Sequence, residues 1–168
     1  RQLVEQGLRR AQLPTWPSPQ AVLAAVGDPF QAVAAGVLVS AQQPVLLGGG
    51  SQMAAVAALA LASLPDQGRK VLADRVLLGS TAWLALERIR GGDMPALGCL
   101  LDEVGHRFGV SLAGLASGLR FHASRQPALR DYEDGFVKEG VGAGALLLLA
   151  QLQGHHSEAL VEGCERAL

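Results

Sequence analysis

A glycine-rich turn between a short apolar run and an apolar helix constrains the fold of this chain most. The run occupies residues 44–47, the turn residues 48–51 and the predicted helix residues 52–64. A second apolar run lies within residues 71–78. Two apolar runs separated by a helix are typical of a βαβ unit, in which the strands are parallel. The sequence therefore predicts an α/β fold: a doubly wound, Rossmann-like parallel sheet flanked by helices, with extra terminal helices.

Further elements are expected on both sides of this unit. A third strand is expected within residues 110–119, although Gly114 and Gly118 weaken the pattern there. Helices are expected over residues 30–41, 82–89, 93–108, 128–133, 145–152 and 157–167. The chain has 168 residues, of which 49% are hydrophobic and 17% charged, so we expect one nucleotide-binding domain with a buried core over residues 1–168.

Composition argues against several classes of function. A net charge of -1 and an aromatic content of 4% give neither the basic surface nor the stacking platforms of nucleic-acid binding. The longest apolar stretch, residues 53–62, is too short to span a bilayer, so no membrane partner is expected. Cys99 and Cys164 lie far apart, which suits a reducing cytoplasm. We expect no metal or other cofactor, because the adjacent His155 and His156 lack supporting ligands.

Two turns with glycine are candidates for binding a phosphate. The first comprises Gly48, Gly49, Gly50, Ser51 and Gln52, and the second Gly79 and Ser80. Free N–H groups at a helix start favour an anion, and turns after parallel strands share the edge of the sheet where ligands usually bind. The first turn is neither a Rossmann fingerprint, because Met53 replaces the third glycine, nor a P-loop. On spacing alone, a tight turn without a ligand explains the first pattern equally well.

The glycine-rich segment before the helix predicted at residues 145–152 is the most specific one. It comprises Lys138, Glu139, Gly140, Gly142 and Gly144. A carboxylate near a helix N-terminus is stabilised in its charged form, and the glycines leave room for a substrate against the backbone. A simple helix cap with a solvated acid is the alternative. The nearby acids Asp131, Glu133 and Asp134 are predicted to form a solvated face.

Two blocks of the sequence resemble a known family. Residues 132–144 read YEDGFVKEGVGAG and look like the C-terminal signature of the nicotinate-nucleotide–dimethylbenzimidazole phosphoribosyltransferase family, in its archaeal and cyanobacterial branch. Residues 27–29, together with residues 45–53, are similar to a second block in the expected order. The resemblance implies a cytoplasmic homodimer that transfers the phosphoribosyl group of nicotinate mononucleotide to a benzimidazole-type base in cobalamin biosynthesis.

The resemblance also implies roles for particular residues. Glu139 matches the general base that takes a proton from the incoming base. The glycine-rich segments at residues 48–52 and 140–144 match the loops that hold phosphate and ribose. Apart from the resemblance, Asp28, His122, Ser124 and Lys138 are further candidates for lining the pocket. His122 is close in sequence to the glycine-rich acidic segment, and a structural histidine is the alternative.

An upstream acidic glycine-rich block of the family has no equivalent in this sequence, and Ala145 stands where the branch commonly has glycine. We therefore expect the chain to be the C-terminal part of a longer family pattern, and to be a weak or inactive transferase alone. The alternative from another class is a non-catalytic nucleotide- or phosphate-binding module. Such a module would retain nicotinate mononucleotide but release no nicotinate.

Overall fold

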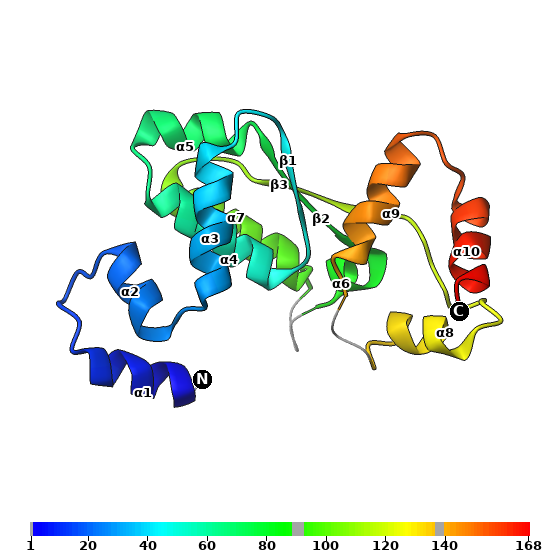
Figure 1. Cartoon of the computed structure of the whole chain (residues 1–168), viewed down its shortest axis with the longest axis horizontal. Coiled ribbons are helices and arrows are strands. Elements are labelled where there is room, and N and C mark those ends of the chain that lie inside the picture. The colour runs from blue at the N-terminus through cyan, green and yellow to red at the C-terminus, as the bar shows by residue number, and fades with distance from the viewer. Residues whose placement is uncertain (1, 89–92, 137–139) are drawn as a thin grey trace.

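The computed structural model describes residues 2–88, 93–136 and 140–168 (Figure 1). In these ranges a parallel sheet contains three strands in the order β1-β2-β3. The strands are β1 (Val45–Gly48), β2 (Val76–Thr81) and β3 (Ala113–Ser117). Because all three are parallel, their carboxyl ends meet at one edge of the sheet.

Helices cover both faces of this sheet. The helices of the described residues are α1 (Gln2–Ala11), α2 (Pro19–Val26), α3 (Pro29–Ser40), α4 (Ser51–Ala62), α5 (Asp66–Ala73), α6 (Ala82–Leu86), α7 (Ala96–Phe108), α8 (Pro127–Glu133), α9 (Ala143–Leu152) and α10 (Ser157–Arg166), and only some of them pack on the sheet. Helices α3, α4 and α7 lie on one side of the strands, and α9 lies across the other side (Figure 1). The predicted α/β fold with a parallel sheet flanked by helices is confirmed. No helix within the described ranges is long and apolar enough to cross a membrane.

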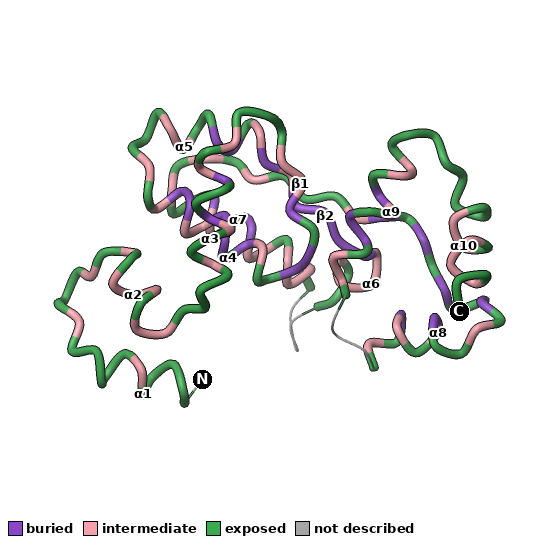
Figure 2. Tube along the Cα trace, in the orientation of Figure 1, coloured by how far each residue is buried: buried purple, intermediate pink, exposed green. Residues whose placement is uncertain are grey.

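The main core lies between the sheet and α4. Successive side chains of a strand point to opposite faces, so Leu47 and Leu78, which are paired in register, lie on the same face of the sheet. Leu47 packs with residues of α3 and α4, and Leu78 with residues of α4 and α7. Helix α4 buries residues on several sides, including Val56 and Leu61, because α3 and α7 pack against it as well as the sheet. Figure 2 shows buried segments gathered where these elements meet.

On the opposite face of the sheet, Gly48 and Gly79 lie where α9 crosses the strands, which lets α9 approach them closely. A Cβ placed on Gly144 would lie 2.3 Å from the carbonyl carbon of Ser80 in β2. The methyl group of Ala145 occupies the space above Gly79, where an added Cβ would be 2.9 Å away. The start of α9 therefore rests directly on the backbone of β2.

The second predicted strand differs in position from the observed one. Residues 71–73 end helix α5, and the strand begins only at Val76. Gly79 and Ser80 do not form a turn, because β2 continues to Thr81. The reason is that β2 is the central strand, and Gly79 pairs with β1 on one side and β3 on the other. Thr81 then accepts a hydrogen bond from the Leu84 N–H and caps α6.

Candidate functional site

A cleft of about 920 Å³ lies at the carboxyl ends of the strands. Its walls come from the residues that follow each strand and from the segment that leads into α9. They are Gly48–Met53 after β1, Trp83, Leu84, Leu86 and Glu87 in and after α6, Arg120 after β3, Glu133, Asp134 and Gly135 at the end of α8, and Gly140, Val141 and Gly142. Ligands of open parallel sheets usually bind at this edge, so the cleft is the candidate site.

Two glycine segments that are far apart in sequence meet in this cleft. A Cβ added to Gly142 would lie 3.0 Å from the carbonyl oxygen of Gly48, and one added to Gly48 would lie 3.2 Å from the carbonyl oxygen of Gly142. Side chains at either position would force the segments apart. Helix α4, capped by Gly50, and helix α9, capped by Gly142, both begin without a side-chain cap. In α9 the N–H groups of Ala143, Gly144 and Ala145 donate to the carbonyl oxygens of residues 140–142. In α4 the N–H groups of Ser51 and Gln52 have no hydrogen-bond partner within the described residues, so the start of α4 is suited to receive an anion.

An aromatic pair supports the second glycine segment. Trp83 and Tyr132 meet edge to face with ring centroids 4.9 Å apart. The Tyr132 hydroxyl donates a hydrogen bond of 2.8 Å to the Gly140 carbonyl oxygen. Burial raises the pKa of Tyr132 above its ordinary value of 10.0, so the hydroxyl stays protonated and keeps this bond at neutral pH. Tyr132 thus positions the backbone that lines the cleft, a role that sequence reasoning missed.

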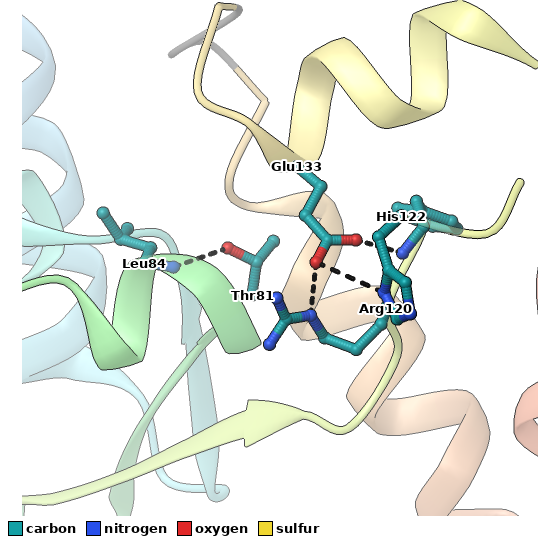
Figure 3. A network of polar contacts seen from close by, with 6 residues as sticks. Thr81, Leu84, Arg120, His122 and Glu133 are labelled. Carbon is teal, nitrogen blue, oxygen red and sulfur yellow. Dashed lines mark hydrogen bonds and ion pairs between the residues drawn. The ribbon is translucent and has the colours of Figure 1, made fainter.

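A buried carboxylate forms part of the cleft wall. Glu133 is the last residue of α8, and its side chain is only 4% exposed. It accepts hydrogen bonds from the Phe121 backbone N–H and from Nε of Arg120 (Figure 3). Nδ1 of His122 lies 3.8 Å from the same carboxylate. The prediction that Glu133 belongs to a solvated face is therefore wrong, because α8 turns it inward against the loop that follows β3.

The ionisation of Glu133 reflects two opposing effects. Burial alone would raise its pKa, whereas the hydrogen bond from Phe121 and the hydrogen bond and positive charge of Arg120 lower it. The net pKa lies below the ordinary value of 4.5. Glu133 is therefore an anion at neutral pH, paired with Arg120 at the edge of the cleft.

The structure brings most of the predicted phosphate-binding residues together. Those that line the cleft are Gly48, Gly49, Gly50, Ser51, Gln52, Gly140 and Gly142. Gly79 and Ser80 lie within β2 instead, and Gly144 packs on the backbone of that strand. Lys138 and Glu139 lie outside the described residues.

The other residues expected in the pocket have different surroundings. Asp28 caps α3 by accepting a hydrogen bond of 2.7 Å from the Phe30 N–H. The side chain of His122 is 70% exposed beside Glu133. Ser124 is buried, and its hydroxyl donates to a carboxylate oxygen of Glu165 at 2.6 Å. Asp28, His122 and Ser124 are not among the described residues that line the cleft, so their roles in binding stay predictions.

Among residues 2–88, 93–136 and 140–168, no group of three or more His, Cys, Asp or Glu side chains is placed to hold a metal ion.

Comparison with known proteins gives a consistent set of relatives. The chain is 96% identical, over 168 residues, to a UPF0284 protein of Parasynechococcus marenigrum. It is 57% identical over 171 aligned positions to a UPF0284 protein of Prochlorococcus marinus, and 44% identical over 161 positions to one of Gloeobacter violaceus. The chain is similar to UPF0284 proteins over its whole length. No family model matches it.

The UPF0284 relatives are considerably longer than this chain. The chain spans 43%, 42% and 40% of the length of the three relatives. Their names state no reaction or ligand. The activity of the whole protein is therefore a matter for proposal.

Proposed function

We propose that the protein carrying this chain transfers the phosphoribosyl group of nicotinate mononucleotide to a benzimidazole-type base, which yields the lower-ligand nucleotide of cobalamin. One observation carries the proposal: two glycine segments from the two blocks that resemble the transferase family, residues 48–52 and 140–142, line a single cleft. The cleft lies at the edge of the parallel sheet where such folds bind nucleotides.

The phosphate is proposed to bind at the start of α4, which opens onto this cleft. Both α4 and α9 begin with glycine caps. In α9 the first N–H groups donate to the carbonyl oxygens of residues 140–142, whereas in α4 those of Ser51 and Gln52 have no partner within the described residues. These groups carry the positive end of the helix dipole. The absence of side chains at Gly48 and Gly142 lets a sugar phosphate approach the backbone.

The reaction needs a base beside the ribose. A ring nitrogen of the acceptor attacks the anomeric carbon, the bond from that carbon to the pyridinium nitrogen breaks, and its electron pair returns to the ring of the departing nicotinate. We assign Glu139 as the carboxylate that takes the proton lost by the acceptor ring and stabilises the positive charge that develops on the ribose. Glu139 directly precedes Gly140, which lines the cleft.

The decisive experiment is Glu139→Gln in the protein at the length of its relatives. Glutamine has nearly the same size but cannot accept the proton, so we expect nicotinate release to fall by roughly a hundredfold or more while nicotinate mononucleotide still binds. Turnover is measured by chromatography of released nicotinate, and binding by calorimetry. Glu158→Gln, at an exposed position in α10, is the matched control and should leave turnover unchanged.

Two outcomes contradict the proposal. If Glu139→Gln lowers the melting temperature but keeps turnover per folded molecule, Glu139 serves only as a structural cap. If the unaltered full-length protein binds nicotinate mononucleotide yet never releases nicotinate with any benzimidazole, it is a binding module and not a transferase.

A further inference from the structure

Arg120 is held in the cleft wall by firmly anchored neighbours. It lies between Leu119 and Phe121, which are 1% and 2% exposed and pack with Leu129 of α8 in a small separate core. The side chain of Arg120 itself is 46% exposed and lines the cleft. The backbone at this position is therefore fixed, while the guanidinium group faces solvent-accessible space.

Glu133 fixes the orientation of that guanidinium group. The buried carboxylate accepts a hydrogen bond from Nε of Arg120 and another from the backbone N–H of Phe121. Figure 3 shows the outer end of the guanidinium group directed away from Glu133, toward Thr81 and Leu84 at the start of α6. Within the described residues its two terminal nitrogens, Nη1 and Nη2, have no hydrogen-bond partner.

Among the described residues that line the cleft, Arg120 is the one with a positively charged side chain. The other charged residues lining the described part of the cleft are the acids Glu87, Glu133 and Asp134. An anionic group bound away from the start of α4 would be repelled by these acids unless it contacted Arg120. A guanidinium group whose Nη1 and Nη2 have no partner among the described residues matches a planar carboxylate, which can accept two parallel hydrogen bonds.

We infer that Arg120 binds a planar carboxylate of the ligand through Nη1 and Nη2, with Glu133 as its positioning residue. This inference rests on the proposed function, in which the carboxylate is that of the nicotinate ring and the phosphate binds at the start of α4. Trp83 also lines the cleft and offers aromatic surface to the pyridine ring. Arg120 thereby selects nicotinate mononucleotide over nicotinamide mononucleotide, whose amide carries no charge.

The test compares these two mononucleotides in the protein at the length of its relatives. Calorimetry should give at least a roughly tenfold preference for nicotinate mononucleotide, which corresponds to one charge-assisted contact. Arg120→Gln should weaken nicotinate mononucleotide alone and remove the preference. Arg125→Gln is the matched control, because Arg125 is exposed, lies five positions after Arg120 and is not among the described residues that line the cleft. The Arg125→Gln protein should keep its preference for nicotinate mononucleotide.

A second variant, Arg120→Lys, distinguishes loss of carboxylate binding from loss of folding. Arg120→Gln leaves the buried carboxylate of Glu133 without its charged partner and can destabilise the protein. Lysine retains the charge but not the planar fork, so Arg120→Lys should keep the melting temperature and lose most of the preference. An unchanged preference in Arg120→Lys overturns the inference. Equal weakening of both mononucleotides overturns it as well, because Arg120 would then bind the phosphate.

Free nicotinate and free nicotinamide separate this inference from the transferase proposal. If nicotinate binds better than nicotinamide in an Arg120-dependent way but no transfer occurs, the transferase proposal fails and the carboxylate site stands. If transfer occurs and Arg120→Lys keeps the full preference for the nicotinate form, the carboxylate site fails and the transferase proposal stands.

Discussion

Replacing Gly144 by alanine should strongly destabilise the protein, because α9 rests on backbone and not on side chains. The added Cβ would lie 2.3 Å from the carbonyl carbon of Ser80, 2.4 Å from the amide nitrogen of Thr81 and 2.5 Å from the carbonyl oxygen of Ser80. All three atoms belong to the central strand β2, which is hydrogen-bonded to a strand on each side. A strand held in this way cannot move aside without losing its pairing.

The magnitude follows from the size of the clash. Ordinary contacts of a Cβ begin at 3.4 Å, so the first turn of α9 must move about 1 Å away from the sheet. Inserting a methyl group into a packed interior costs about 1–3 kcal/mol, and more where the neighbours are rigid. We expect a loss of about 3 kcal/mol for Gly144→Ala. In a protein of this size that loss lowers the melting temperature by roughly 6–12 °C.

The assay is thermal unfolding followed by far-ultraviolet circular dichroism, with Gly36→Ala as the matched control. Gly36 lies within α3, is exposed, and has no atom within 4 Å of an added Cβ. Alanine there should stabilise the helix by about 0.5–1 kcal/mol, because glycine is a poor helix former. If Gly144→Ala melts at the temperature of the unaltered protein while Gly36→Ala is slightly stabilised, the close packing of α9 on β2 is refuted.

Two further predictions concern charge. The pKa of Glu133 is lower in the folded protein than its ordinary value of 4.5, so its carboxylate stabilises the fold above that pH and this contribution is lost as the pH falls through the folded-state pKa. The difference in melting temperature between the unaltered protein and Glu133→Gln should therefore be largest near about pH 7 and should decrease toward about pH 3. A difference that does not change with pH would contradict stabilisation of the fold by the ionised Glu133 carboxylate. Nicotinate mononucleotide should bind at least about tenfold more tightly than nicotinate riboside in calorimetry, because only the former carries a phosphate for the start of α4; equal affinities would remove phosphate recognition from the proposal.

The sequence predicted the features of the sheet that depend on local pattern. The glycine turn after residues 44–47 follows an apolar run and precedes an apolar helix, and the structure has β1, a turn and α4 in that order. The helix predicted at residues 157–167 also depends on local pattern, and it matches α10 (Ser157–Arg166) closely. Helix α5 was missed because it is only eight residues long, contains Gly68, and ends in apolar residues that read as the start of a strand.

The part of the site that the sequence did not predict depends on tertiary structure. Glu133 stands in an acidic, polar stretch, and nothing in its neighbours along the chain indicates burial. Its surroundings come from the loop after β3, whose Arg120 and Phe121 donate hydrogen bonds to it from more than ten positions earlier in the sequence. In the same way, Gly79 reads as a turn residue from its type alone, while pairing with strands on both sides keeps it in β2.

The glycine walls of the cleft also determine how this protein can be dissected by mutagenesis. Alanine scanning works by deleting atoms, and a residue that binds through its side chain is revealed by the loss. At Gly48, Gly49 and Gly142 alanine adds an atom, which would meet Ala145, Met53 or the carbonyl oxygen of Gly48. A scan across these positions would report steric exclusion of a ligand or of the opposing wall, and not the strength of any contact removed. Backbone amide-to-ester replacement, which deletes a single N–H donor and leaves the shape intact, is the substitution suited to measuring what these segments bind.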